Sequence, residues 1–393
     1  MAIVWVCGGE CRILGPGAGA VPDDRHYGPG SGTPSTSTTT VHTGTSSIRC
    51  NAAGATVSAD RPFSATTRAF GCYVRFASLP SAAMAFVRFV NANGNMDIEV
   101  DNLGAITAKI GTGTRSASAG TVSTGTWYRI DALAESSTGT ASLKFRVDGG
   151  TEQQATNAQV SVVMTSVQHG PRGAFTCDCF FDDILHGDAT TDYPFGAHTV
   201  ERMKPTRDSS HSFTAGDFAY NTAGGNVATS ATDVWSFLDD DDLNDTSDLI
   251  RQAVIRSTGY VQIGFGTAPN SWAALAVMVV MSFHSSTTGA NTFGVKMNDG
   301  GTLRDLLDES GDGLSDVSQT TAINVEKLVV TPPTGGTWTA STLGAILLRG
   351  GFSTDVIGIP YWDGAMLEVA YGPQPAGGSL IYSRRRMQTH LVR

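Results

Sequence analysis

The sequence FVRFVNANGNMDIEVDNLGAITAKI (86–110) alternates apolar and polar residues in short runs that Asn- and Gly-rich turns separate. The same alternation returns in WYRIDALAE (127–135) and ASLKFRVDG (141–149), again with Gly, Ser and Thr between the runs. Successive side chains of a strand point to opposite faces, so alternation with turn signals roughly every ten residues predicts antiparallel strands. We therefore expect a β-sandwich or barrel around this stretch.

A second set of runs, after residue 212, has the same character and predicts a second all-β unit. The runs are LIRQAVI (249–255), GYVQIGF (259–265), WAALAVMVVMSF (272–283), TFGVKMN (292–298), VEKLVVTP (325–332), LGAILLRGG (343–351) and GAMLEVAYG (364–372). The run at 272–283 is the longest apolar one, too short to cross a bilayer and suited to a buried strand. We therefore expect no membrane insertion.

These patterns predict an all-β chain of two antiparallel, jelly-roll-like β-sandwich domains, at 46–190 and 212–372. Residues 1–45 are rich in Gly, Pro, Ser and Thr and are expected to form an extended arm. Such an arm lies on a neighbouring subunit or stays free, and we expect its deletion to leave folded domains. Residues 191–211 are expected to be a linker with one short strand, AHTVERMKP (197–205), and 373–393 a short basic tail.

The charge balance excludes some partners. The chain has a formal net charge of −10, and only 16% of its residues are charged, below the usual quarter. No basic stripe crosses the predicted sheets, which argues against nucleic acid as a partner. The one basic cluster, Arg384 to Arg386 with Arg393, lies in the tail. A polar, weakly charged surface is typical of extracellular particles and assembled shells.

Asp97, Glu99 and Asp101 alternate along one predicted strand and should project from one face. Concanavalin-like glycosidases place paired carboxylates on such a strand, where one acts as acid and the other as base or nucleophile. The order here, Asp-Ile-Glu-Val-Asp, differs from the Glu-x-Asp-x-x-Glu of that group. The intervening apolar residues supply the core side, so we interpret these carboxylates as the solvated face of a half-buried strand.

Two acidic segments are candidate calcium loops. Asp308, Ser310, Asp312 and Asp316 have the spacing of oxygen ligands, although Gln319 stands where an EF-hand has its closing glutamate. The segment 239–248 fits less well, because Asp245 occupies the position that requires glycine and Arg251 that of the glutamate. Solvated turns are the alternative interpretation of both segments.

The six cysteines are too few for a disulfide-built scaffold. Cys177 and Cys179 should share a strand face, and His169 and His186 flank them in sequence. A zinc site is therefore one interpretation of these four residues. The spacing matches no common zinc pattern, so buried free thiols are favoured over a metal centre.

No nucleophile elbow, zinc-protease helix, phosphate-binding loop or dinucleotide fingerprint occurs, so we expect no catalytic residues and no cofactor other than candidate calcium. Trp235, Trp338 and Trp362 could stack on sugar rings, but packing in the core is the default for tryptophan.

The run TGTWYRIDALAE, followed by SLKFRVDGG and FFDDILHGD, resembles the laminin-G-like (concanavalin-like) sandwich of many tailed-bacteriophage virion proteins. There a Trp-Tyr-Arg strand precedes a strand ending in Val-Asp-Gly, and a closing strand ends in an Asp-Asp turn, here Asp182–Asp183. A Val-x-x-x-x-Pro strand follows at 200–205, and TPPTGGTWTASTLGAILLRGGF late in the second domain is also similar.

The resemblance implies a non-enzymatic structural or adhesive protein located in the virion, either a capsid decoration or a minor tail or fibre-type protein. Its implied partners are other virion proteins and host-surface glycans, and its implied state is a homo-oligomer, with a trimer favoured by analogy with phage spikes. A carbohydrate-active protein, either a lectin or a polysaccharide depolymerase, is the alternative.

Overall fold

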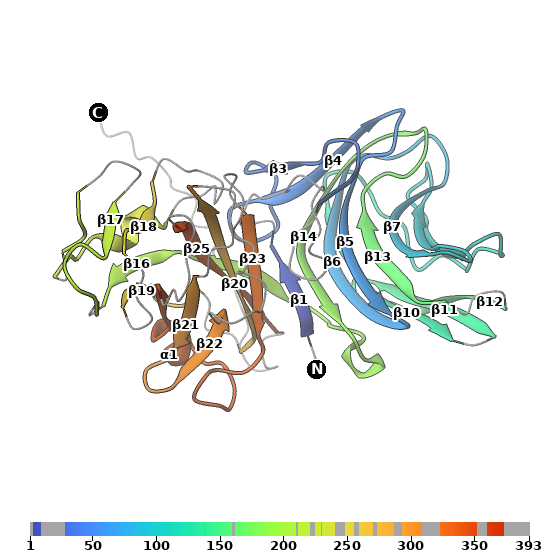
Figure 1. The fold of residues 1–393 in the computed structure, drawn as a ribbon. Coiled ribbons are helices and arrows are strands. Elements are labelled where there is room, and N and C mark those ends of the chain that lie inside the picture. Colours follow the sequence, from blue (N-terminus) through green and yellow to red (C-terminus); the bar gives the residue numbers. More distant parts are fainter. Residues whose placement is uncertain are drawn as a thin grey trace, which may run out of the picture.

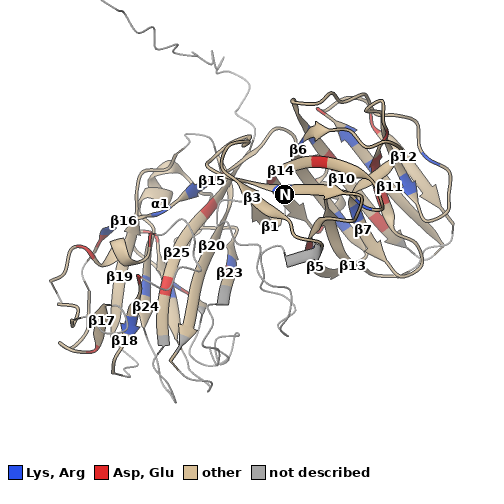
Figure 2. Cartoon of the chain, turned by 90° about the horizontal axis from the view of Figure 1, so that it is seen from above, with Lys and Arg blue, Asp and Glu red and all other residues tan. Residues whose placement is uncertain are grey.

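The computed structural model describes residues 3–8, 28–137, 139–158, 162–209, 211–220, 225–228, 230–239, 248–254, 259–269, 273–286, 293–307, 323–351 and 360–372. Within these ranges the chain is nearly all antiparallel β, as the sequence predicts, and it forms two sandwiches side by side (Figure 1). No helix in the described ranges is long and apolar enough to cross a membrane. Figure 2 shows charged residues of both signs scattered over both sandwiches.

The first sandwich packs an eight-stranded sheet on a six-stranded one, here called the β6 sheet and the β7 sheet. The β6 sheet has the order β12-β11-β10-β6-β14-β4-β3, with β1 added along β14. Its strands are β1 (Ile3–Cys7), β3 (Ser35–Ser37), β4 (Ser47–Ala53), β6 (Thr67–Ser78), β10 (Trp127–Ser137), β11 (Thr140–Val147), β12 (Gln153–Asn157) and β14 (Thr176–Gly187). The β7 sheet has the order β2-β5-β13-β7-β8-β9: β2 (Gly28–Ser31), β5 (Ser58–Ala65), β13 (Met164–His169), β7 (Met84–Asn91), β8 (Met96–Val100) and β9 (Ile106–Ile110).

The second sandwich packs a six-stranded sheet, the β25 sheet, on a five-stranded one, the β19 sheet. The β25 sheet holds β15 (Thr199–Met203), β17 (Phe218–Tyr220), β18 (Ile250–Gln252), β20 (Ala274–Ser285), β23 (Ile323–Val329) and β25 (Pro360–Tyr371). The β19 sheet holds β16 (Pro205–Asp208), β19 (Tyr260–Phe265), β21 (Gly294–Asn298), β22 (Leu303–Leu307) and β24 (Leu347–Gly351). A short helix, α1 (Ala340–Gly344), precedes β24 and takes the first residues of the strand predicted at 343–351. Two 3-10 turns, η1 (Thr190–Asp192) and η2 (Val234–Phe237), complete the described elements.

The prediction of an extended N-terminal arm is wrong for β1, β2 and β3, which are strands of the first sandwich. β1 pairs with the end of β14, from Ile3 opposite Gly187 to Cys7 opposite Ile184, and its Trp5 is only 2% exposed. β2 and β3 likewise pair with β5 and β4. The apolar run at 3–7 therefore finds its burial within its own chain rather than on a neighbouring subunit. Deleting residues 2–45 would remove core side chains, so that truncation cannot yield an intact first sandwich.

β1 also joins the two sandwiches, and Figure 1 shows it lying between them. The Trp5 indole Nε1 donates to Glu326 Oε2 of β23 at 2.7 Å, and the Gly8 amide donates to Glu368 Oε1 of β25 at 3.4 Å. The Arg61 guanidinium of β5 lies 5.0 Å from the Trp5 ring and contacts the same Glu326 carboxylate. Apolar side chains of β20 and β25 continue the first core across this junction: Ala276, Met278, Val280, Met366 and Ala370.

The predicted linker at 191–211 contributes strands as well. β15 pairs with β25 and β16 pairs with β19, so both belong to the second sandwich. The predicted basic tail at 373–393, with its arginine cluster, lies outside the described residues.

Candidate binding surface on the β6 sheet

The outer face of the β6 sheet carries partly exposed aromatic and arginine side chains. On β6, Cys72, Val74 and Phe76 are fully buried in the core, while Tyr73 and Arg75 between them are half-buried and point away from it. The alternation follows from the two-residue period of the strand. This face is therefore where the first sandwich presents side chains for contact.

Strand register brings four of these side chains into one line across the sheet. Trp127 of β10 is opposite Arg75 of β6, Arg75 is opposite Phe180 of β14, and Phe180 is opposite Arg49 of β4. We call Trp127, Arg75, Phe180 and Arg49 the aromatic–arginine row. Directly opposed residues of antiparallel strands have Cβ atoms about 5 Å apart on the same face. The row thus alternates aromatic rings with guanidinium groups across four strands.

Phe180 is the centre of the row and is held by its two cationic neighbours. The Arg49 and Arg75 guanidinium carbons lie 5.5 and 5.9 Å from the Phe180 ring centroid, and the ring is only 5% exposed. Arg49 forms a two-point ion pair with Asp178, at 3.0 and 2.8 Å, which raises the Arg49 pKa. Arg75 donates through Nε to the Gly125 carbonyl at 3.0 Å and has no carboxylate partner among the described residues.

A second aromatic group adjoins the row. The His42 ring stacks on Tyr73 with centroids 3.7 Å apart and planes 17° from parallel, and the Trp127 ring meets His42 edge-on at 5.6 Å. Burial raises the pKa of the Tyr73 hydroxyl, and the positive charge and hydrogen bond of Arg129 oppose that rise. His42, Tyr73 and Trp127 therefore form one half-buried platform of rings.

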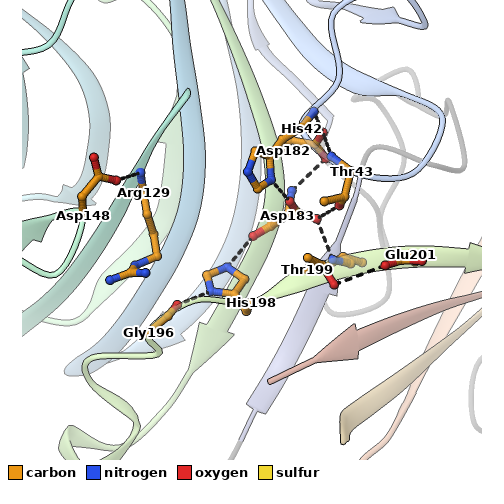
Figure 3. A network of polar contacts seen from close by, with 11 residues as sticks. His42, Thr43, Arg129, Asp148, Asp182, Asp183, Gly196, His198, Thr199 and Glu201 are labelled. Carbon is orange, nitrogen blue, oxygen red and sulfur yellow. Dashed lines mark hydrogen bonds and ion pairs between the residues drawn. The ribbon is translucent and has the colours of Figure 1, made fainter. Parts of the chain in front are cut away.

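The platform rests on a buried carboxylate network, shown in Figure 3. Asp183 Oδ2 pairs with His42 Nδ1 at 2.5 Å, while its Oδ1 accepts from the Thr43 hydroxyl at 2.5 Å and from the Val200 amide at 2.6 Å. Asp182 accepts the His42 amide at 2.7 Å and the Asp183 amide at 2.8 Å. These bonds fix the loop that carries His42 over the sheet.

The predicted Asp182–Asp183 turn at the end of a strand is wrong, because β14 continues to Gly187. The two residues form a bulge instead: the register with β6 shifts between Asp182 and Leu185, and Asp183 has a φ of +49°. Aspartate tolerates this left-handed conformation better than most residues do. The bulge turns the Asp183 carboxylate toward His42, Thr43 and Val200, which the regular pleat would not allow.

A loop before β15 covers the neighbouring part of the face. The two ring nitrogens of His198 face two carbonyl oxygens, those of Gly196 at 2.8 Å and Asp183 at 2.7 Å. Gly71 of β6 lies under this loop, where an added Cβ would meet Phe195 Cδ2 at 2.9 Å. The Gly196 amide donates to the buried Asp131, which also pairs with Arg129. The face that stays open is therefore the aromatic–arginine row with the adjoining rings.

Of the three carboxylates predicted on one strand, Asp97 and Glu99 lie on β8 of the β7 sheet, away from the row, and Asp101 follows the end of that strand. Asp97 is held by Arg88 at 2.7 and 2.8 Å, and Glu99 is paired with Arg115. Asp101 accepts the backbone amides of Leu103 and Ala105 in a turn. Glu99 is more buried than a solvated face implies, because its neighbours on the sheet cover it.

The thiols and imidazoles considered for zinc are buried and are not brought together as a metal centre. The described residues contain no group of three or more His, Cys, Asp or Glu side chains that could hold a metal ion. Burial raises the pKa of the Cys179 thiol and of Cys50, the latter to about 12, and lowers that of His169 to about 3. The calcium candidates Asp308, Ser310, Asp312 and Asp316 lie outside the described residues, as do 240–247 of the other acidic segment.

The three tryptophans considered for sugar stacking pack in or on the second core. Trp362 is fully buried, Trp338 is nearly so and donates to the Val329 carbonyl, and Trp235 is half-buried against the same core. Trp127, Tyr73, Arg75 and His42 were not predicted from the sequence as binding candidates. The signal for Trp127 was present in the WYR strand, whose Trp and Arg must share a face. Its opposition to Arg75 depends on a strand more than fifty residues earlier.

No protein-family model matches the sequence, and no curated protein is similar to it. Among solved structures, the tandem CBM22 domain of Paenibacillus barcinonensis Xyn10C shows 10% identity over 95% of this chain and 98% of that chain, with a TM-score of 0.26. Domains LG4-5 of the mouse laminin alpha1 chain show 10% identity over 84% and 83%, with a TM-score of 0.27. A sialidase shows 10% identity, but this chain spans only 16% of it, with a TM-score of 0.28. TM-scores this low carry no inference about function.

Proposed function

We propose that this protein is a non-enzymatic structural component of a tailed-phage virion, either a capsid decoration or a minor tail or fibre-type protein, that binds host-surface glycans through the β6 sheet. The observation that carries the binding role is the aromatic–arginine row with the Trp127, Tyr73 and His42 rings beside it. Aromatic faces stack on apolar faces of ligands, and guanidinium groups supply directed hydrogen bonds. The virion assignment rests on the sequence resemblance described above.

The state of the carboxylates supports a binding role over a catalytic one. A glycosidase needs one carboxyl group as acid and another as base or nucleophile, on either side of the sugar bond. Here Asp97, Glu99 and Asp131 are each committed to an arginine, and Asp178 is paired with Arg49 inside the row itself. An ion-paired carboxylate is a poor proton donor near neutral pH.

The alternative, a depolymerase, has one observation in its favour. His284 Nδ1 lies 2.6 Å from the buried Asp363 carboxylate on β25, and burial raises the pKa of Asp363 to about 6. A carboxyl group with such a pKa can act as a general acid. The pair lies on the second sandwich rather than beside the row, so the binding role remains the proposal. Release of reducing sugar from bound polysaccharide, lost in Asp363→Asn, would favour the depolymerase.

The proposed partners are other virion subunits, and the proposed state is a homo-oligomer with a trimer favoured. Since β1 is committed to its own chain, assembly contacts must use other surfaces than Ile3–Cys7. The net charge of −10 supports the exclusion of nucleic acid.

The test has two parts. Antibody against this chain should capture intact particles, and imaging of labelled particles should place the chain on them. A chain absent from purified particles would refute the virion role.

In a glycan array, Trp127→Ala should lose most of the signal of the wild type, because the stacking ring is gone. Trp235→Ala is the matched control, the same change at a half-buried tryptophan in the second sandwich. Equal loss in both variants would refute the row as the binding site.

A further inference from the structure

We infer that the glycan bound on the β6 sheet is acidic, with a carboxylate held by Arg75 and a sugar ring stacked on Trp127. This inference rests on the proposed function and names the ligand class of the same site. It comes from Arg75, which has no carboxylate partner among the described residues.

Arg75 differs from Arg49 and Arg129 on this face because no described carboxylate is paired with it. Arg49 is paired with Asp178 at 2.8 Å, and Arg129 is paired with Asp131 at 2.9 Å. Arg75 donates through Nε to the Gly125 carbonyl, and its guanidinium carbon lies 5.9 Å from the Phe180 ring centroid. The chain as a whole has a net charge of −10, yet this half-buried cation has no carboxylate neighbour among the described residues. An anionic group of a ligand would pair with it.

The Arg75 guanidinium is also positioned in advance. Nε donates to the Gly125 carbonyl, and the guanidinium carbon lies 5.9 Å from the Phe180 ring centroid. Gly125 has a φ of +82°, which favours glycine at this turn. The two Nη groups make no hydrogen bond to any described residue. Two parallel N–H donors match the two oxygens of a carboxylate, so little side-chain entropy is lost on binding.

Trp127 lies beside these donors, directly opposite Arg75 in the register. A sugar ring on the indole thus places a ring carboxylate within reach of the guanidinium. The row crosses β10, β6, β14 and β4, which at about 4.8 Å between strands is a length of about 14 Å. That length fits an oligosaccharide better than a single sugar. Arg49 lies at the other end of the row, and its side chain is 40% exposed. Its guanidinium extends the positive potential along the row.

The experiment is an array of uronic-acid- and sialic-acid-containing oligosaccharides, each beside its carboxyl-reduced counterpart. The full-length wild type should bind carboxylated members at least ten-fold more tightly than the reduced ones, and the preference should weaken with salt. Arg75→Ala should abolish that preference while keeping the residual binding to reduced members, and Arg75→Lys should restore part of it. Arg115→Ala is the control, because it removes an arginine that pairs with Glu99 of the β7 sheet, and it should keep the preference.

The outcomes separate this inference from the proposed function. Equal binding of acidic and reduced members by the wild type, with loss in Trp127→Ala, would overturn the acidic ligand and leave the glycan-binding role standing. A preference that survives in Arg75→Ala would also overturn the inference. Absence of binding to every member would refute the glycan-binding role itself. Unchanged melting temperatures show that each variant is folded.

Discussion

The two outer faces of the first sandwich are built on the same strand geometry and differ in how their charges are matched. On the β7 sheet, one line of paired residues runs Asp60, Gln168, Arg88, Asp97 and Lys109 across five strands. Arg88 holds Asp97 at two points, and Gln168 donates to Asp60 at 3.2 Å. On the β6 sheet, the aromatic–arginine row leaves Arg75 without a carboxylate among the described residues.

The difference shows how a sandwich separates stability from recognition. Opposite charges paired across strands stabilise a sheet and leave little for a ligand to complete. A row in which an arginine stacks on an aromatic ring is rigid, yet retains free hydrogen-bond donors. Substitutions on the β7 sheet should therefore change stability, whereas those on the open row should change binding.

The largest loss of stability is expected for the buried Asp183 carboxylate, which holds the loop that carries His42. Asp183→Ala removes the acceptor of His42, Thr43 and the Val200 amide at once, and should cost about 3–5 kcal/mol of unfolding free energy. Urea denaturation followed by tryptophan fluorescence measures it. Asp178→Ala on the same strand is the control and should cost about 1 kcal/mol or less, since its partner Arg49 is exposed. Equal costs would show that the network does not support the platform.

Arg88→Ala should have a smaller effect on stability and none on glycan binding. It leaves the half-buried Asp97 carboxylate unpaired, at a cost of about 1–3 kcal/mol. The double variant Arg88→Ala/Asp97→Ala should cost less than the sum of the single changes, because both remove one interaction.

Arg75→Ala should show the opposite pattern to Arg88→Ala, with weaker glycan binding and nearly unchanged stability. If both arginines affected stability alike, the contrast between the faces would be lost.

The smallest effect is the pH dependence of the β7 sheet. Burial raises the pKa of Asp60 above its ordinary 3.8, against the opposing hydrogen bonds of Gln168 and Ser166. The folded state then holds the proton more tightly than the unfolded state, so this group's contribution is present below pH 3.8 and is lost as pH rises through the raised pKa. Asp60→Asn should reduce the dependence of the unfolding free energy on pH in the range where Asp60 loses its proton. Denaturation across pH 3.5–7 compares the two, and parallel curves would contradict the assignment.

Much of the fold could be predicted from local sequence. Alternation predicted the strands β7 to β11, and the apolar run at 272–283 became β20. The sequence could not show that Ile3–Cys7 pairs with residues about 180 positions later, because a short apolar strand does not specify its partner. The Gly- and Pro-rich composition of the following segment suggested an arm. The burial of Trp5 between the sandwiches instead holds the start of the chain in the first sandwich.

The candidate surface was less accessible to sequence reasoning. Its row draws one residue from each of β4, β6, β10 and β14, and their opposition depends on registers set by the whole sandwich. The bulge at Asp183, which fixes His42, likewise has no local signature beyond two adjacent aspartates. By contrast, the alternation of Asp97 and Glu99 was visible, and their pairing with arginines explains why they contribute no open site.

The most direct measurement is an equilibrium titration of a carboxylated oligosaccharide, selected from the array, into wild type and Trp127→Ala, with the length of the oligosaccharide determined at the end. We predict saturable binding to the wild type, at least ten-fold weaker binding to Trp127→Ala, and an oligosaccharide of unchanged length. Equal affinity for both proteins, or a shortened oligosaccharide, would contradict a non-enzymatic binding face on the β6 sheet.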